Sequence, residues 1–510
     1  MKNVFALCLR VVTATCVMAS VAVGQVVRPP SGDESSDAGW MFDPSAVVDI
    51  DLTVPDSSME QISCDMGAPR PYVPALFTMT YTKSSRGGTS MKKYGPWTVG
   101  IHTKGMYGSF RCLPEGEKAG LKVKFSSASH RIDGIIKKLT LNNMVQDPTM
   151  AKQTLCYDIF QAMGVASPRT GFARVSINGV YRGLYLNVET YDDVSLPRWY
   201  PSTKHLYEGS YGSWWGSVSN AYSGHYAVDE GDETDRDDLQ LLIDTAKDNS
   251  PGWYARMAPI ADLEQMTRMW ATEWFVGHWD GYSTRLPNNY FLHSDNDVRF
   301  TMCPWGVDQT FEWASQPGVS RDAFLQNNCL TDPIGGSMYT DALRTVTSTV
   351  KGMHFNHRAD AIYRVVCQEG SAGVEEIKEF VARRIRNCEA WAANAPAVPR
   401  YMSVFSSRGT TWVGWRPPRV TTGITGITGY AVEYRSNSIP WTRVTVASTA
   451  TSTTIMDLAC GTYEFRIRSI IAEGSRVASR IERTHENGDG YWFLSPQTSL
   501  PLTKSSVRIR

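Results

Sequence analysis

Residues 270–311 concentrate oxygen-bearing side chains at the ends of predicted elements. Asp280 leaves an apolar helix just before a glycine, Asn289 opens a predicted strand, and Asp308 lies at the end of the next strand. Antiparallel neighbours would bring Asn289 and Asp308 to the same end of their ladder, within reach of one cation. Mg²⁺ takes one or two carboxylates plus substrate phosphates, so this spacing suits a metal site for phosphoryl transfer, with Asp280 orienting the attacking hydroxyl. The alternative is that Asp280 is a helix-end cap and Asp308 a turn residue.

A second candidate cluster is basic and lies earlier in the chain. Lys104 precedes a glycine, and Lys122 and Lys124 share one face of a predicted strand because side chains alternate across a strand. A paired ammonium face can hold the phosphates of a nucleotide. The solvated side of an amphipathic strand is the alternative interpretation.

Other catalytic templates are missing from the sequence. No G-x-S-x-G, H-E-x-x-H, G-x-x-x-x-G-K-[ST] or G-x-G-x-x-G occurs in a strand-to-helix context. The nine histidines are scattered, and His278 is expected to satisfy a helix end. Residues 229–238 carry many carboxylates without the EF-hand order of ligands, which favours a solvated acidic loop over a calcium site.

The elements that must position these residues change type along the chain. Alternating β-like runs come first, a hairpin joined by Asn178-Gly179 follows, and helical patterns dominate after residue 238, which indicates an α+β body. A helix is predicted over 148–163, with Asp147 as its N-cap and Pro148 at its first position. The predicted strands are 47–54, 75–81, 97–103, 121–125, 172–177 and 183–189, and the later helices are 260–279, 339–354, 360–368 and 374–391.

Short strands at about ten-residue spacing follow the prolines that break the last helix, which is typical of a β-sandwich. Trp415 would form the inter-sheet core and Tyr463 the tyrosine corner, and residues 397–484 resemble a fibronectin type III domain. Such domains act as spacers or binding modules, so a surface or matrix partner is expected here and no chemistry.

The N-terminus carries a targeting signal. Lys2 and Arg10 are the only charges in the first 24 residues, and the apolar run after Arg10 has the length of a signal-peptide core, so cleavage before Gln25 is predicted. An uncleaved anchor is the alternative, although the run is short for a membrane span, and no later stretch reaches spanning length. The protein is therefore expected to be secreted or at the cell surface.

Net charge and cysteine content restrict the classes of partner, cross-link and metal that the chain is expected to have. Fifty-one Lys plus Arg balance 51 Asp plus Glu, so no global field would draw the chain onto nucleic acid or an anionic membrane. Eight cysteines remain after the predicted cleavage, and an even number in an exported chain favours disulfides, with their connectivity open. Zinc is disfavoured because no two of them form a C-x₂₋₄-C pair.

Nine short blocks in one order support a family resemblance. They include His278-Trp-Asp-Gly-Tyr282, Asn288-Asn-Tyr290 and Pro304-Trp-Gly-Val-Asp-Gln-Thr-Phe311. With them, residues from about 47 to 393 resemble the spore coat protein H (CotH) kinase family, a group of secreted atypical protein kinases and related surface proteins. The other blocks are residues 49–55, 99–105, 118–125, 141–143 with 147–149, 164–169 and 178–189.

The resemblance implies a kinase-like fold that binds ATP and Mg²⁺ between two lobes and phosphorylates Ser or Thr of exported proteins. Asp280 matches the family's catalytic-loop aspartate and Asp308 its metal-binding aspartate. Lys122 or Lys124 matches the lysine-bearing strand near the nucleotide, and Glu189 falls where the chain passes between lobes. The expected nucleotide contacts are therefore Lys104, Lys122, Lys124 and Glu189.

One departure bears on activity. Many members have Pro-Trp-Asp-x-Asp, whereas Gly306 stands here at the first aspartate, so metal affinity would be weaker or Asn289 would compensate. A non-catalytic surface or adhesion protein that retains the fold is therefore the second hypothesis, supported also by the aromatic loop with Trp214 and Trp215. Nucleotidyl transfer at the same metal site is a third.

These observations together predict an α+β chain with an all-β appendage. Its segments are a signal peptide (1–24), a flexible linker (25–45), a two-lobed atypical kinase-like domain (46–394), a fibronectin type III sandwich (397–484) and a C-terminal tail (485–510).

Overall fold

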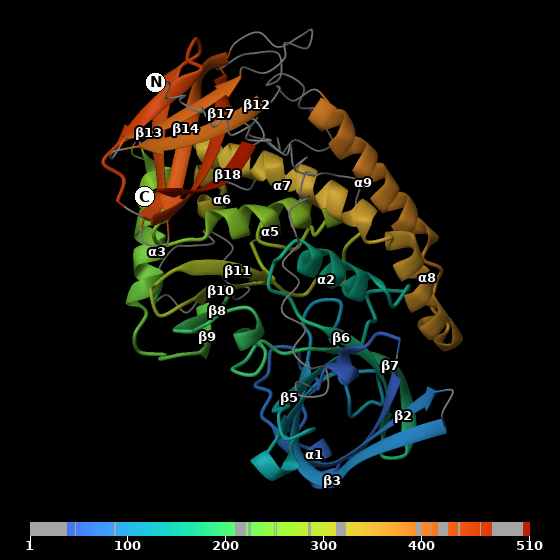
Figure 1. Cartoon of the computed structure of the whole chain (residues 1–510). Coiled ribbons are helices and arrows are strands. Elements are labelled where there is room, and N and C mark those ends of the chain that lie inside the picture. The colour runs from blue at the N-terminus through green and yellow to red at the C-terminus, as the bar shows by residue number, and fades with distance from the viewer. Residues whose placement is uncertain are drawn as a thin grey trace, which may run out of the picture.

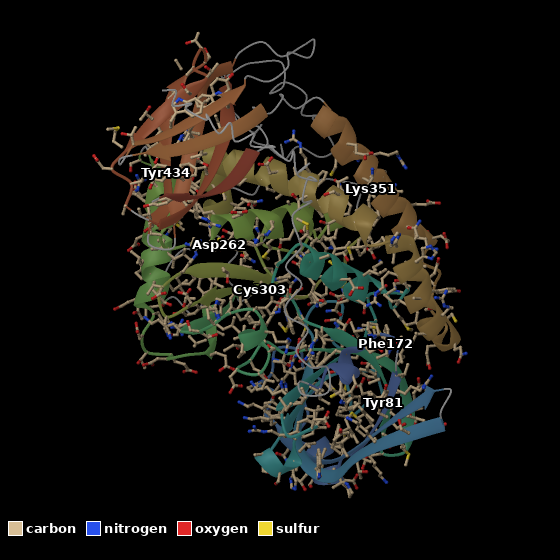
Figure 2. All side chains as sticks on the ribbon, viewed as in Figure 1. Tyr81, Phe172, Asp262, Cys303, Lys351 and Tyr434 are labelled. Carbon is tan, nitrogen blue, oxygen red and sulfur yellow. A yellow bond between two sulfur atoms is a disulfide. The ribbon has the colours of Figure 1, made fainter. Side chains whose placement is uncertain are left out.

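The computed structural model contains a β-barrel, a helix-and-sheet body and a β-sandwich (Figure 1). The predicted signal peptide and the paired Trp214 and Trp215 lie outside the residues that it describes. Figure 2 places Phe172 in the barrel, Cys303 in the helix-and-sheet body and Tyr434 in the sandwich. The described residues are 38–45, 47–85, 88–209, 221–222, 226–248, 250, 252–283, 287–312, 323–393, 400–407, 410–416, 427–436, 439–459, 461–471 and 503–509.

Seven strands close the barrel in the order β1-β2-β3-β4-β5-β7-β6. Period-two alternation produces its wall: in β1, Val48, Ile50 and Leu52 are buried while Asp49 and Asp51 face solvent. β1 pairs antiparallel with β2 and parallel with β6, which completes the closure. The strands are β1 (Val47–Thr53), β2 (Val73–Ser85), β3 (Gly88–Lys104), β4 (Gly120–Phe125), β5 (Lys138–Asn142), β6 (Thr170–Ile177) and β7 (Val180–Val188).

The predicted hairpin at Asn178-Gly179 is confirmed between β6 and β7. Both residues have positive φ, 50° and 76°, the conformation that a tight two-residue turn requires and that these residue types tolerate. The Asn178 side chain also accepts from Val54 N (2.7 Å) and donates to Val54 O (3.0 Å), which ties the turn to the end of β1.

Part of the predicted flexible linker is folded. Gly39–Phe42 forms a short 3₁₀ helix, and Met41 and Phe42 are 2% and 8% exposed in the apolar core of the barrel. The Met41 carbonyl lies so close to Gly171 that a Cβ there would be 2.1 Å from it. The expectation of flexibility was wrong for these residues because the Trp-Met-Phe triplet buries apolar area on the barrel.

The helix-and-sheet body holds a four-stranded antiparallel sheet in the order β11-β10-β8-β9. One apolar cluster contains residues of this sheet, of its helices and of the outer face of β6 and β7, so the body and the barrel share a core. The strands are β8 (His205–Gly209), β9 (Tyr226–Glu230), β10 (Tyr290–Ser294) and β11 (Phe300–Pro304), and the helices are α2 (Lys152–Ala162), α3 (Asp237–Lys247), α4 (Trp253–Met257), α5 (Leu263–Val276), α6 (Phe324–Thr331), α7 (Pro333–Gly352), α8 (Phe355–Val366) and α9 (Glu375–Ala393).

The helix predicted from residue 148 begins only at Lys152. Asp147 accepts hydrogen bonds from the backbone N–H groups of Thr149 (3.0 Å) and Lys152 (2.8 Å), and Met150 between them has φ 54°. Asp147 therefore closes a turn that precedes the helix, and the prediction that it is the helix N-cap is wrong, because Ala151 occupies that position.

The sandwich consists of two antiparallel sheets. Trp415 is buried in its core, 4% exposed, as predicted. Tyr463 is 2% exposed in the same core, and its role as a tyrosine corner stays a prediction. Residues 503–509, predicted to lie in a C-terminal tail, form β18 and pair with β17, so the sheet extends beyond the predicted boundary at 484. One sheet contains β12 (Arg400–Ser407), β13 (Thr410–Arg416) and β16 (Ser452–Met456), and the other β15 (Ile439–Ala447), β14 (Ile427–Ser436), β17 (Gly461–Ile471) and β18 (Thr503–Ile509).

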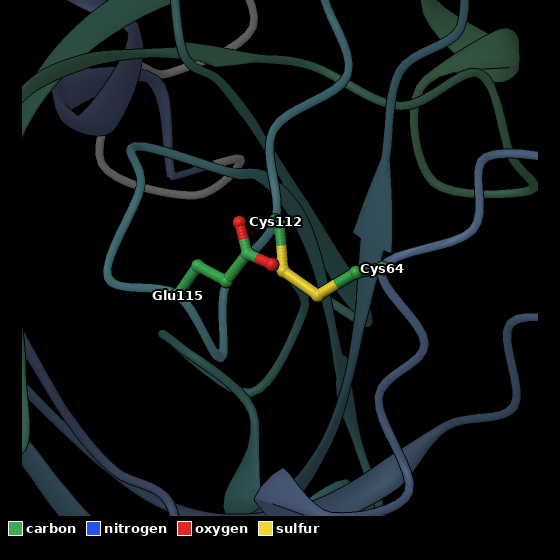
Figure 3. A group of neighbouring side chains, drawn as sticks. All are labelled: Cys64, Cys112 and Glu115. Atoms are coloured by element: carbon green, nitrogen blue, oxygen red, sulfur yellow. A yellow bond between two sulfur atoms is a disulfide. The ribbon is translucent and has the colours of Figure 1, made fainter.

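The cysteines are paired only in part. Cys64 and Cys112 form a disulfide, with Glu115 beside it (Figure 3). The expectation of general disulfide pairing is wrong for five other described cysteines, which are free. Four of these are buried among apolar residues, where a thiol packs as a small hydrophobe. The free cysteines are Cys156, Cys303, Cys329, Cys367 and Cys388.

Among the helices of the described residues, none combines the length and the apolarity that crossing a membrane requires.

Candidate active site

The site begins where α5 ends. Gly277 (φ 68°) terminates the helix in a left-handed conformation, and residues 278–283 then turn toward β10. On this turn, Asp280 accepts a hydrogen bond from Asn289 Nδ2 at 2.7 Å, and Asn288 Nδ2 lies 3.3 and 3.4 Å from its two carboxylate oxygens. Burial raises the pKa of Asp280, and these amide donors oppose the rise. The structure thus brings Asp280 and Asn289 into direct contact.

The end of the β10–β11 ladder carries the second part of the site. Trp305 N donates to Asn289 O at 2.9 Å directly beyond the Tyr290–Pro304 pair, so Asn289 and the turn that contains Asp308 lie at the same end, as the antiparallel spacing predicted. Gly306 has φ 54°, and a Cβ on it would be 2.4 Å from Asn289 Oδ1. The Asn289 amide therefore fills the space beside Gly306.

Asp308 is a carboxylate in a largely enclosed and mixed electrostatic environment. Burial raises its pKa; the positive charge of Lys104 opposes the rise and the negative charge of Asp147 adds to it. Asp308 also contributes to the raised pKa of Asp280. Because burial raises the pKa of both carboxylates, a cation bound between them would favour their ionised form.

The predicted basic residues divide into two groups. Burial lowers the pKa of Lys104 to about 8, and Asp308 and Glu208 oppose this, which places the Lys104 ammonium in the field of the Asp308 turn. Lys122 affects the pKa of Lys104 and of Glu208, so it belongs to the same cluster. Lys124 is exposed, and its Nζ lies 5.7 Å from the Tyr72 ring centroid. Lys104 therefore lies in the field of Asp308 and Lys122 in that of Lys104 and Glu208, whereas Lys124 contacts an aromatic ring.

Glu189 has other partners. Its carboxylate is 6% exposed and forms ion pairs with Arg169 (2.8 Å) and Arg198. These pairs hold the end of β7 against the segment before β6 and against the short 3₁₀ helix Leu196–Arg198. The carboxylate is thus engaged structurally, and a role of Glu189 in binding a nucleotide stays a prediction.

Asn289 and Asp308 offer the oxygen ligands that a divalent cation requires. Within the described residues, Asn289 Oδ1 accepts no hydrogen bond and faces the Gly306 turn, two residues before Asp308. A carboxylate and an amide oxygen are hard ligands, and Mg²⁺ commonly takes few protein oxygens because phosphates and water complete its shell. The donor set therefore fits Mg²⁺.

Two sequence comparisons cover the region of this site. Residues 102–354 match the family model described as CotH kinase protein. The match contains all the predicted site residues and leaves out β1, β2, most of β3, α8, α9 and the sandwich. Inner spore coat protein H of Bacillus subtilis (strain 168) is 24% identical over 203 residues, which cover 34% of this chain and 50% of that protein. The chain thus spans about half the length of this curated relative.

The solved structures that match lie at low structural similarity to this chain. A computationally redesigned β-sandwich protein is 23% identical, with a TM-score of 0.15, and the match covers 22% of this chain and 91% of that chain. The fibronectin type III domain of human collagen XX is 20% identical, with a TM-score of 0.13, over 15% of this chain and 83% of that domain. Scores this low establish no shared fold, so the fibronectin type III assignment stays a prediction.

Four site residues were not predicted from the sequence. Glu273 lies under the Asp280 turn, His278 is 0% exposed and affects the pKa of both aspartates, Asp147 affects the pKa of Asp308, and Glu208 affects that of Lys104. His278 does not satisfy a helix end as expected, because neither ring nitrogen has a hydrogen-bond partner in the described structure. Only the family blocks around Asp147 and His278 offered a signal for any of them.

Proposed function

We propose that this chain is an exported, Mg²⁺-dependent protein kinase that transfers the γ-phosphate of ATP to serine or threonine of an exported protein. The observation that carries the proposal is the contact of Asp280 with Asn289 at the end of β10, in the same cluster as Asp308 and Lys104. The match of residues 102–354 to the CotH kinase protein model supports it independently. The surface location implied by the spore coat relative's name agrees with export.

Each residue has a distinct task in this proposal. Asp280 accepts a hydrogen bond from the acceptor hydroxyl and takes its proton as the oxygen attacks the γ-phosphorus and the bond to the bridging oxygen of ADP breaks. A raised pKa makes this carboxylate a better base, provided that it is ionised at the working pH. Lys104 and Lys122 hold phosphate oxygens by charge-assisted hydrogen bonds.

Asn289 and Asp308 would hold the cation. Mg²⁺ held there would supply positive charge that neutralises the charge developing on the phosphate oxygens. The Asn289 amide has a second task, because its Nδ2 also donates to Asp280 O at 3.0 Å and so fixes the turn. The same side chain thus connects the metal position to the base.

The test is phosphate transfer from γ-labelled ATP to dephosphorylated casein with and without Mg²⁺. Asp280→Ala and Asp308→Ala are each expected to lower transfer by about 10²–10³-fold, since electrostatic and positioning terms supply most of this catalysis. Asp51→Ala on the exposed face of β1 is the matched control and should match wild type. Equal transfer by all four proteins would refute the proposal, and label incorporated only from α-labelled ATP would assign nucleotidyl transfer instead.

A non-catalytic surface protein is the second candidate function. The observation that favours it is Gly306, which leaves a single carboxylate, Asp308, on the turn after β11. The two functions differ in nucleotide binding. Absence of calorimetric ATP binding at millimolar Mg²⁺ would favour the surface protein.

A further inference from the structure

The Asp280 turn rests on a buried carboxylate from the preceding helix. Glu273 on α5 is 0% exposed. Its Oε1 accepts from the backbone N–H of Tyr282 at 2.9 Å, and its Oε2 accepts from the N–H and the hydroxyl of Ser283 at 3.1 and 2.5 Å. One side chain therefore fixes both residues that follow Asp280-Gly281.

The space around this carboxylate is filled. A Cβ on Gly281 would lie 2.5 Å from Glu273 Oε1 and 2.6 Å from His278 Nδ1. The His278 Nδ1 atom itself lies 3.7 Å from Glu273 Oε1. The chain can thus pass over Glu273 only if residue 281 has no side chain, and Asp280, directly before it, is placed by the same constraint.

Buried carboxylates usually have a cationic partner. The Glu273 carboxylate instead accepts hydrogen bonds from Tyr282 and Ser283. Its ion pair in the described structure is with a histidine, which is charged only when protonated. A carboxylate that accepts several N–H and O–H bonds holds its donors more strongly than an amide oxygen does. Glu273 therefore selects one conformation of the turn rather than merely filling space.

We propose that Glu273 is a positioning residue for the reaction: it acts through residues 281–283 to hold the Asp280 carboxylate where the acceptor hydroxyl arrives. This inference rests on the proposed function. It assigns Glu273 no contact with ATP, with the cation or with the acceptor. Its loss should therefore affect the chemical step and leave nucleotide binding intact.

The experiment measures kcat and KM for ATP, with Mg²⁺ and dephosphorylated casein, together with calorimetric Mg-ATP affinity. Glu273→Gln keeps the size of the side chain but presents an NH₂ group to donors. We expect kcat to fall roughly 10–100-fold while KM and the affinity for ATP stay within about twofold, since small misplacements of a catalytic group have this cost. Ser283→Ala removes one donor and should lower kcat by a smaller factor, even if Glu273→Gln folds poorly.

The double variant separates positioning from general stability. Combined with Asp280→Ala, Glu273→Gln should lower kcat no further than Asp280→Ala alone, because Glu273 acts only through Asp280. Wild-type kcat in both Glu273→Gln and Ser283→Ala, or multiplicative losses in the double variant, would overturn the inference, whereas the loss in Asp280→Ala alone would still support the proposed function. No transfer by wild type would overturn the proposed function and this inference together.

Discussion

The ammonium group of Lys104 gives the proposed site a specific pH dependence. Burial lowers its pKa to about 8 in the protein without nucleotide. The protonated form attracts phosphate and the neutral form does not, so nucleotide affinity should be constant below pH 7 and fall as the pH rises through 8. Bound phosphates keep the ammonium protonated, and the pKa of the free protein therefore sets where the fall begins.

The size of the effect follows from this pKa. A group with a pKa of about 8 is about 90% protonated at pH 7 and about 10% at pH 9, which corresponds to a roughly tenfold weaker Kd, or about 1.4 kcal/mol. Titration calorimetry with Mg²⁺ and a non-hydrolysable ATP analogue at pH 7, 8 and 9 measures it directly.

Lys104→Arg is the control, because a guanidinium stays charged throughout this range. Its Kd should change less than twofold between pH 7 and 9. Burial also lowers the pKa of Lys118 to about 8, but this ammonium lies 5.2 Å from the Tyr185 ring centroid and in the field of Glu369. A tenfold fall that persists in Lys104→Arg would assign the titration to another group and refute the argument.

Three further outcomes are expected. Gly306→Ala should lower phosphate transfer at least about tenfold, because residue 306 has positive φ and the new Cβ displaces Asn289 Oδ1; wild-type transfer would contradict this. Glu189→Ala removes the carboxylate shared by Arg169 and Arg198 and should lower the free energy of unfolding by about 3–5 kcal/mol in urea titrations, and a change under about 1 kcal/mol would count against it. Replacing Cys64 and Cys112 by serine removes a cross-link with a sequence separation of 48 and should lower the same quantity by about 2–4 kcal/mol, whereas wild-type stability would argue that the bond adds nothing.

Local patterns were enough to predict much of the fold. Alternation located β1 and β4, and the Asn178-Gly179 pair located the hairpin, because each depends on neighbouring residues alone. Closure of the barrel by the parallel β1–β6 pair and addition of β18 to the sandwich depend on contacts between segments far apart in sequence. The alternation of residues within a single strand does not indicate which distant strand it pairs with.

In the candidate site too, features set by local spacing were predicted, and features set by contacts between distant residues were not. Antiparallel geometry placed Asn289 and Asp308 at one end of a ladder, since the spacing of two adjacent strands fixes which ends meet. Glu273 was missed because a glutamate on an amphipathic helix has the same pattern whether its carboxylate faces solvent or holds a turn. The contacts of Glu189 with Arg169 and Arg198 could not be foreseen either. They join residues 20 and 9 positions apart, respectively, and no helical or strand periodicity relates these positions.

Gly306 illustrates why a departure from a family motif needs the structure before it is interpreted. The missing carboxylate suggested a weakened cation site. In the structure, Asn289 occupies the adjacent space: its Nδ2 holds Asp280 at 2.7 Å and its Oδ1 faces residue 306, where no side chain could fit. A carboxylate at 306 and this orientation of Asn289 are therefore mutually exclusive. The glycine is the condition under which one amide can reach both the proposed base and the proposed cation position, which offsets in part the carboxylate that the turn lacks.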